Sequence, residues 1–520
     1  MKRFSILMIL FVAVTAMGVA RPIPITVYNT PKQTITGFGA ACCDGAMCPY
    51  GIDTNPVKLL YGPQSKIGLN IMRMEISPNF IGDVRVAEWG NWDTPYDWNG
   101  SLPSAKIVKQ RGGIVFGTPW SPPGEYKTNG TAQGGNADNQ GNQRGKLRED
   151  CYELFFPWLN TFLKWMKDNG VDVDAVSLQN EPDWWVSYSG CLYDPEDLVK
   201  LVKNYAWMLD RESFPGVKII SGEPLGFTQN YTDPLMKDAT CREQVDIVAG
   251  HLYGHLPLKY MKPAGVLPLK YGKELWMTEH SVTDNIDHLP TWYENLIFAE
   301  ELNECMLSGC TGYIYWYMRA HWAFVGTGES WEYERNGVKT TISSPDNKKN
   351  VLLPRAYVMS HFAKHVTGST RLATSRDDDG GRQDEGQAAA LEYSAYIKGD
   401  SIIVMAINTM ATDRELKIKL PSFKVKNGIH LLSTGNETEN LCQESDLDID
   451  EPVNELIVSM PASSLNTYIL MIDHGSTAIE GISYVKEDAR GWCTLDGRRL
   501  SMKPTKKGLY VHNGKKVVIK

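Results

Sequence analysis

Two glutamates stand where apolar, strand-like runs give way to loops. Glu181 lies in the run DAVSLQNEPDW, and Glu279 lies in the run KELWMTEHS. In an α/β barrel the chemistry is carried at the C-terminal ends of the strands, where the following loops gather on one face. Two carboxylates facing one cleft are the minimum equipment for breaking a glycosidic bond. The positions of these two residues therefore indicate glycoside hydrolysis.

A retaining glycosidase gives its two carboxyl groups different tasks. One protonates the leaving oxygen, and the other, about 5–5.5 Å away, attacks the anomeric carbon. Their surroundings must therefore differ, so that one stays protonated and the other ionised. Asn180 adjoins Glu181 and is placed to hydrogen-bond a sugar 2-hydroxyl. A lone glutamate at a strand end is more often a salt-bridge partner than a catalytic group. Two such glutamates, one of them within Asn-Glu-Pro, make the catalytic interpretation the better one.

Other polar residues at predicted strand ends are candidates for supporting roles. We expect Arg73 to pair with the nucleophile and hold it ionised; a structural ion pair inside the barrel is its alternative role. Glu75 and Glu223 are interpreted as supporting groups at best. His251 and His255 are four residues apart, but a glycine between them and a proline shortly after disfavour a helical metal site.

Aromatic residues near the same strand ends are candidate sugar contacts. Tyr253 is placed to hydrogen-bond a carboxylate or a sugar. Trp120 follows the third predicted strand and could stack on a sugar ring. Trp316 could form the floor of the subsite that holds the sugar under attack, or it could be an interior side chain of the barrel. Trp184, Trp185 and the tryptophan-rich segment AEWGNWDTPYDWNG could wall the cleft.

Strand-like runs alternate with helical patterns over residues 36–366. Eight such runs are visible, namely ITGFGA, NIMRMEI, GIVFGTP, DAVSLQNEP, VKIISGEP, VDIVAGHLYG, ELWMTEH and GYIYWYM. Amphipathic segments such as CYELFFPWLNTFLKWMKDNG separate them. This alternation predicts an α/β fold, a (β/α)8 TIM barrel. A doubly wound open sheet is the alternative, but it usually carries a glycine-rich phosphate loop, which the chain lacks.

The pattern changes after residue 366. Short alternating runs over residues 367–473 predict a side antiparallel β-sandwich, to which residues 21–35 could add an edge strand. Residues 474–520 form a separate β-prone tail, which resembles the C-terminal sorting tails of cargo for type IX secretion. A small extension of the sandwich is the alternative for this tail.

The termini and the composition limit location and partners. Residues 1–20 have the basic start, apolar run and small-residue cleavage site of a secretory signal peptide. No later segment is apolar enough to predict a membrane span, so we expect a protein secreted or held at the cell surface or in the periplasm. A net charge of −8 without a basic stripe argues against nucleic-acid partners. We expect a monomer without metal or cofactor. The ten cysteines are too sparse for a disulfide framework, and their pairing stays open.

The motifs ITGFGA, PWSPP, SLQNEPD, HLYG and ELWMTEH, in this order, resemble glycoside hydrolase family 30, most closely its bacterial xylanase branch. The resemblance spans residues 25–472. It implies a barrel with a side β-sandwich and retaining hydrolysis by double displacement. It also implies that Glu181 is the general acid/base and Glu279 the nucleophile, and that the substrate is the backbone of β-1,4-xylan.

The chain departs from the pattern of members that depend on glucuronate branches. Those members have two adjacent arginines after the eighth strand, where this chain has Arg319 and Ala320. They also have a tyrosine two residues after the nucleophile, where this chain has Ser281. Glu125 stands where an aromatic residue usually follows PWSPP. We therefore expect an endo-xylanase that does not strictly require glucuronate. The alternatives are hydrolysis of a β-1,6-galactan or β-1,6-glucan, and a catalytically silent glycan-binding protein.

Overall fold

The computed structural model describes residues 21–42, 54–78, 98, 100–134, 144–186, 188–282, 290–316, 318–320, 322–328, 331–335, 338–342, 349–376, 387–388, 391–435, 442–474, 492–494, 499–500, 504–512 and 515–519. The predicted signal peptide, residues 1–20, lies outside them. The chain divides into two compact units, one ending at Ile472 and the other spanning Asp473–Lys520.

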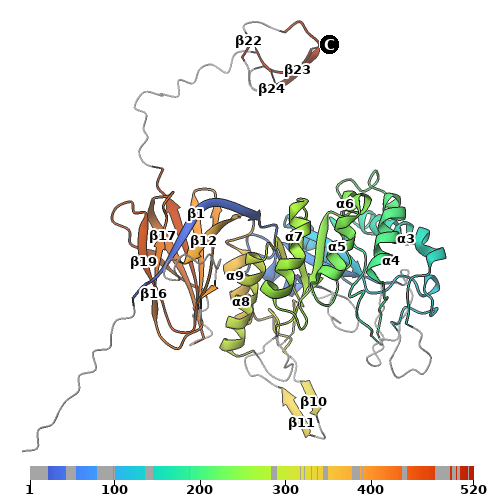
Figure 1. Ribbon diagram of the computed structural model, residues 1–520, viewed down its shortest axis with the longest axis horizontal. Coiled ribbons are helices and arrows are strands. Elements are labelled where there is room, and N and C mark those ends of the chain that lie inside the picture. The colour runs from blue at the N-terminus through green and yellow to red at the C-terminus, as the bar shows by residue number, and fades with distance from the viewer. Residues whose placement is uncertain are drawn as a thin grey trace, which may run out of the picture. The chain divides into compact units, whose positions relative to one another are not determined.

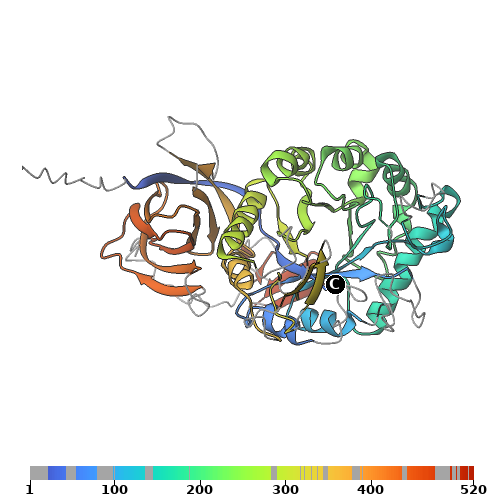
Figure 2. The same cartoon turned by 90° about the horizontal axis from the view of Figure 1, so that it is seen from below.

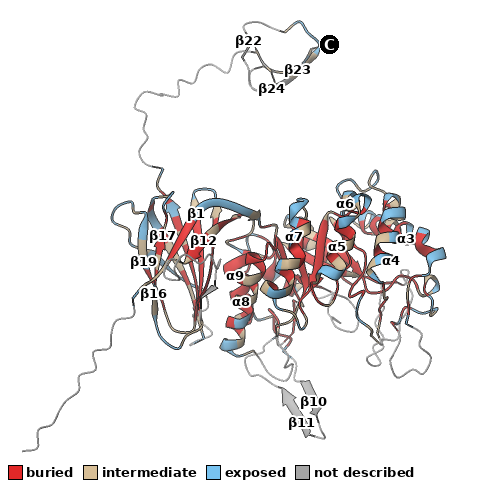
Figure 3. Ribbon diagram, in the orientation of Figure 1, coloured by how far each residue is buried: buried red, intermediate tan, exposed pale blue. Residues whose placement is uncertain are grey.

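A closed barrel of eight parallel strands forms the centre of the first unit (Figure 2). In barrel order the strands are β2 (Gly37–Ala41), β3 (Ile71–Ile76), β4 (Ile114–Pro119), β5 (Ala175–Ser177), β6 (Lys218–Ile220), β7 (Ile247–His251), β8 (Glu274–Glu279) and β9 (Gly312–Tyr315). Each strand coincides with one of the eight predicted runs, with β2 extending one residue past its run, so the predicted TIM barrel is confirmed. The strands read as nearly continuous apolar runs because both of their faces are buried; Figure 3 shows this burial in red.

Helices surround the barrel and cover the outer face of its strands (Figure 2). They are α1 (Asn55–Leu60), α2 (Leu102–Gln110), α3 (Tyr152–Asp168), α4 (Pro195–Tyr205), α5 (Gln229–Lys237), α6 (Ala239–Gln244), α7 (Lys262–Lys270), α8 (Trp292–Leu307) and α9 (Pro354–Ala363). Sequence signals fix several of their ends. Thr291 and Glu294 form a reciprocal capping box at the start of α8, and Asp194 does the same with Asp197 at α4.

The side β-sandwich is built from one ten-stranded sheet beside the barrel (Figure 1). Its strands are β1 (Ile23–Thr34), β12 (Thr370–Arg376), β13 (Gln387–Ala388), β14 (Leu391–Lys398), β15 (Ser401–Asn408), β16 (Arg414–Lys419), β17 (Val425–Thr434), β18 (Gln443–Leu447), β19 (Glu455–Met460) and β20 (Ser464–Ile472). A separate hairpin joins β10 (Trp331–Arg335) to β11 (Val338–Ile342).

The N-terminal strand is not at an edge, and this part of the sequence-based prediction is wrong. β1 lies between β12 and β16, antiparallel to the first and parallel to the second. Alternation of apolar and polar residues reports which face of a strand is buried, but it does not report which strands flank it. The position of β1 depends on long-range pairing between the two ends of the unit.

The second unit contains a small sheet of its own. Its strands are β21 (Trp492–Cys493), β22 (Arg499–Leu500), β23 (Gly508–His512) and β24 (Lys515–Ile519), in the order β22-β21-β23-β24. The rings of Trp492 and His512 stack with centroids 4.2 Å apart. The tail is therefore β-structured, as predicted. Among the described residues, no helix has the length and apolar character to cross a membrane.

Candidate active site

Glu181 is held in place by the backbone that continues past β5. Its N–H donates to the carbonyl of Glu223 at 2.8 Å, and the N–H of Glu223 donates to Gln179 at 2.9 Å. The residue is 7% exposed and adopts a φ of 42°, in the left-handed region that non-glycine residues rarely occupy. Backbone strain of this kind costs about 1–3 kcal/mol and persists mostly at functional positions. The strained turn places the carboxylate at the mouth of the barrel.

Glu279 is the last residue of β8 and is 6% exposed. Its Oε2 accepts a hydrogen bond from Arg73 Nη1 at 2.5 Å, and its Oε1 accepts one from the Tyr253 hydroxyl at 3.0 Å. The carboxylate is therefore gripped on both oxygens by donors. Arg73 was predicted to pair with the nucleophile, and Tyr253 was predicted to bond a carboxylate or a sugar; the structure brings both to this carboxylate.

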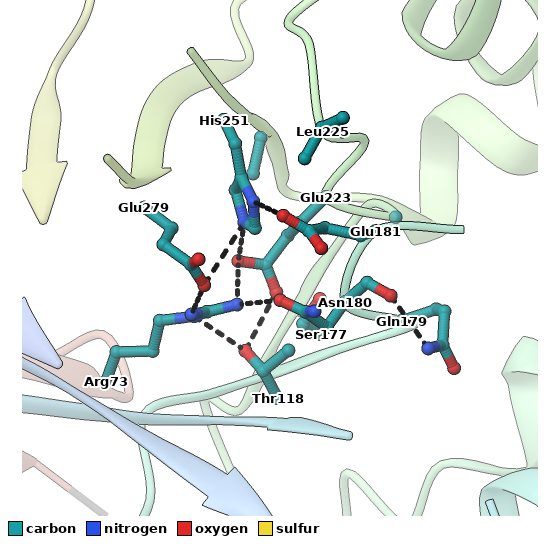
Figure 4. Close-up of polar contacts among 12 residues, drawn as sticks. Arg73, Thr118, Ser177, Gln179, Asn180, Glu181, Glu223, Leu225, His251 and Glu279 are labelled. Carbon is teal, nitrogen blue, oxygen red and sulfur yellow. Dashed lines mark hydrogen bonds and ion pairs between the residues drawn. The ribbon is translucent and has the colours of Figure 1, made fainter. Parts of the chain in front are cut away.

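Arg73, on β3, is fully buried and organises the floor of the site (Figure 4). Besides its contact with Glu279, its Nη2 donates to Asn180 Oδ1 at 2.7 Å and lies 3.2 Å from Glu223 Oε2. Its Nε lies 3.4 Å from Thr118 Oγ1. A planar guanidinium presents several donors in a fixed geometry, which suits this many acceptors at once. Arg73 thus ties strands β3, β4 and β8 and the loops after β5 and β6 together.

His251, the last residue of β7, lies between the carboxylates (Figure 4). Its Nδ1 is 3.1 Å from Glu181 Oε1, and its Nε2 is 3.7 Å from Glu223 Oε2 and 3.9 Å from Glu279 Oε2. One oxygen of Glu181, one ring nitrogen of His251 and one oxygen of Glu279 all lie within 4.8 Å of one another. The two predicted catalytic carboxylates are therefore close neighbours.

The surroundings separate the carboxyl groups in their proton affinity. Burial raises the pKa of Glu181, and the charge of Glu279 adds to this, against the opposing hydrogen bond from His251. Burial also acts to raise the pKa of Glu223, but the charge of Arg73 and the contacts with His251 outweigh it and lower that pKa to about 2. For His251, burial lowers the pKa, and the surrounding carboxylates, Glu279 first, more than reverse this and raise it to about 9.

The predicted aromatic residues line the same mouth. Trp120 follows β4, is 8% exposed and has its ring 4.6 Å from the Arg73 guanidinium. Trp316 follows β9, and its ring centroid is 5.8 Å from that of Trp120. Trp184 is half exposed and lies three residues after Glu181, in a turn closed by a hydrogen bond from its N–H to the Glu181 carbonyl at 3.0 Å. The rings of Trp120 and Trp316 therefore lie together beside the guanidinium that holds Glu279.

Two predicted contacts fall elsewhere or stay open. Arg319 is 3% exposed, with its backbone bridged to Val325, and its proposed contact with substrate stays a prediction. Trp98, from the tryptophan-rich segment, is not a cleft residue: it packs edge-on against Phe162, and its indole N–H donates to Ser77. The rest of that segment up to residue 97 lies outside the described residues.

Sequence reasoning missed His251 and Thr118 and understated Glu223. The Thr118 hydroxyl donates to Glu223 Oε1 at 2.8 Å, and Glu223 is fully buried rather than peripheral. All three stand at the ends of predicted strands, which was the available signal. His251 was considered only with His255 as a metal pair, because helical spacing was tested instead of its place at the end of a strand.

The cluster has the composition of a metal site, but protein donors already contact its carboxylates. Glu181, His251 and Glu279 are near enough to share an ion. However, the Arg73 guanidinium occupies one oxygen of Glu279, and the Tyr253 hydroxyl occupies the other. A cation there would meet a guanidinium and a histidine whose pKa is raised. The arrangement instead places a carboxyl group whose pKa is raised, Glu181, near a carboxylate held by two donors, Glu279.

No protein-family model matches the chain. It is similar to glucuronoxylanase XynC of Bacillus subtilis (strain 168), with 24% identity over 453 residues that cover 85% of this chain and 90% of that protein. Its fold matches the crystal structure of a glycoside hydrolase family 30 subfamily 8 xylanase, Xyn30A of Clostridium acetobutylicum, with a TM-score of 0.68 and 28% identity, covering 86% of this chain and 99% of that one. It is also similar to an endo-1,6-β-D-glucanase of Neurospora crassa, with 26% identity over 178 residues, 30% of this chain and 36% of that protein.

Proposed function

Since the chain is a glycoside hydrolase of family 30, in its xylanase-like branch, we propose that it cleaves the β-1,4-xylan backbone within the chain by retaining double displacement. Glu181 is the general acid/base, and Glu279 is the nucleophile. The observation that carries this proposal is the closeness of the two carboxylates, which have oxygens within 4.8 Å of each other. Inverting enzymes separate the pair by about 6.5–9.5 Å, to leave room for a water molecule.

The first step forms a covalent intermediate. Glu279 Oε attacks the anomeric carbon while Glu181 donates its proton to the leaving oxygen, so that the glycosidic bond breaks. Burial raises the pKa of Glu181, which favours the protonated form that this task needs. The Arg73 and Tyr253 donors hold the attacking carboxylate in one orientation. Asn180, itself fixed by Arg73, is positioned to hydrogen-bond the sugar 2-hydroxyl.

The second step releases the sugar. Glu181, now ionised, removes a proton from a water molecule, which attacks the anomeric carbon on the face that the leaving group vacated. The bond from the anomeric carbon to Glu279 breaks, and the carboxylate is restored. Two inversions give net retention of configuration. Trp120 and Trp316 support stacking of the sugar at the point of attack.

We propose that glucuronate branches are not strictly required. Ala320 occupies the place of the second arginine that grips glucuronate in branch-dependent members. Ser281 replaces the tyrosine after the nucleophile. A lost charge-assisted contact costs about 1.5–3 kcal/mol, which is roughly ten- to a hundredfold in selectivity. The partial likeness to the Neurospora crassa endo-1,6-β-D-glucanase favours β-1,6-glucan as the second candidate substrate.

We also propose that the protein is exported as a monomer, with residues 1–20 removed and the Asp473–Lys520 unit acting as a sorting tail. The small independent sheet of that unit supports this role, because a recognition module must fold by itself. Mass spectrometry of the protein from culture fluid, and sedimentation of the purified chain, test these points. A mature chain that still begins at Met1 would contradict export through the predicted signal.

The activity is tested with the purified chain on unsubstituted xylan, glucuronoxylan, arabinoxylan, β-1,6-galactan and β-1,6-glucan. We expect xylo-oligosaccharides from unsubstituted xylan, with the β-anomer formed first by NMR. Products from glucuronoxylan alone would contradict the relaxed branch requirement. Products from a β-1,6-glycan alone would keep the mechanism and replace the substrate, and an α-anomer formed first would rule out retention.

A further inference from the structure

The buried charges of the site balance in both halves of the proposed reaction. Arg73 and His251 are the cations, and Glu223 and Glu279 are the anions when Glu181 carries its proton. Once Glu279 is esterified, its charge disappears, and Glu181, having given up its proton, becomes an anion instead. The two positive and two negative charges are preserved, and only the position of one negative charge has moved.

His251 lies between the two positions of that charge (Figure 4). Its Nε2 side faces Glu279 at 3.9 Å, and its Nδ1 side contacts Glu181 at 3.1 Å. Among the described residues, the cation paired with Glu181 is His251, whereas Arg73 contacts Glu279 and Glu223. The imidazolium is therefore the cation that faces the charge in the second half. A fully buried cation between two alternating anions avoids exposing either of them uncompensated.

Glu223 keeps the ring charged when Glu279 cannot. Its Oε2 lies 3.7 Å from His251 Nε2, a shorter distance than that of Glu279, and it is fully buried. Arg73 and the Thr118 hydroxyl hold it from the other side. Among the described residues, the charged or titratable groups around His251 come from the strands and loops on the same side of the barrel. They are Glu181 after β5, Asp183 in the same turn, Glu223 after β6, Tyr253 after β7, Glu279 on β8 and Arg73 on β3.

We propose that His251 is a permanently charged positioning residue with which the two catalytic carboxylates pair in turn, Glu279 before the covalent intermediate forms and Glu181 after it. Glu223 maintains its charge throughout. This inference rests on the proposed retaining mechanism. The histidine gives no proton to the substrate; it acts by making the ionised form of Glu181 available as the base of the second step.

His251→Gln keeps a hydrogen-bond donor and removes the charge. Glu181 then ionises less readily in the intermediate, so the second step slows at acidic pH. With a dinitrophenyl xylobioside, the first step needs no acid, and its rate appears as the burst of dinitrophenolate. We expect the burst to persist, the steady rate at pH 5 to fall about tenfold or more, and the loss to shrink as pH rises, since each pKa unit is a factor of ten. Azide, which needs no general base, should restore turnover.

Glu223→Gln provides a second variant, and His255→Gln, from the same loop, is the matched control. The first should slow the same step in the same pH direction. The second should match the parent, because the His255 ring bonds the Tyr253 carbonyl and packs against Tyr260, away from the carboxylates. Equal losses in both steps without a pH shift, or without azide rescue, would overturn the proposal. If the parent chain releases no dinitrophenolate at all, the proposed function fails instead.

Discussion

Replacing Arg73 tests the electrostatic reasoning most directly. The guanidinium is fully buried and contacts two carboxylates, Glu279 at 2.5 Å and Glu223 at 3.2 Å, as well as the Asn180 amide at 2.7 Å. Arg73→Met leaves two buried anions without their main cation, and breaking a buried pair in this way costs about 3–5 kcal/mol of folding free energy. Arg73→Lys keeps the charge and so should destabilise less, but its compact ammonium lacks the planar fork and loses part of these contacts.

The effect on catalysis follows from the same contacts. In Arg73→Lys, loss of two hydrogen bonds, at least one of them to a charged group, removes about 3–4 kcal/mol of orientation. This corresponds to roughly two to three powers of ten in kcat/KM. The assays are urea unfolding and kcat/KM on xylan. Arg371→Met is the matched control, because Arg371 is 3% exposed but belongs to β12 of the sandwich. Unfolding free energy and kcat/KM of Arg73→Met both within error of the Arg371 control would refute the reasoning.

Three further outcomes are expected. Burial lowers the pKa of His361 to about 3 and that of His365 to about 4, so below pH 6.5 the unfolded chain binds more protons than the folded chain. The contribution of these histidines to the free energy of unfolding, measured with urea, should be complete above pH 6.5 and should fall by about 1.4 kcal/mol per pH unit per histidine as pH drops toward 4. A flat profile would contradict this. Trp184→Ala should raise KM on xylan about fivefold, for roughly 1 kcal/mol of lost stacking, and should change hydrolysis of a dinitrophenyl xylobioside much less. The control is Trp207→Ala, which removes an exposed tryptophan just after α4. Equal effects of the two variants on KM would contradict a sugar contact at Trp184. A chelator should leave the rate on xylan unchanged, and loss that is restored by a divalent cation would show a metal requirement.

The elements could be predicted better than the site. Apolar runs that alternate with amphipathic segments are enough to predict a barrel, because the residues of each strand by themselves indicate that the strand is buried. Glu181 and Glu279 were found by the same logic, since strand ends gather at one mouth. The role of His251 could not be predicted in this way, because it depends on three carboxylates at or after the ends of different strands. The local sequence does not show which strand ends lie next to one another in the barrel. The interior place of β1 was missed for a related reason: both of its partners lie more than 300 residues away.

The left-handed backbone at Glu181 has a consequence for the evolution of this chain. A glycine would relax the strain at φ 42°, whereas an alanine would retain it. Both variants lack the carboxyl and differ in this strain, so the Glu181→Gly chain should be inactive but more stable than the Glu181→Ala chain. Selection for thermal stability alone would favour replacement of Glu181 by glycine. Thermal stability and turnover therefore place opposite demands on this one position.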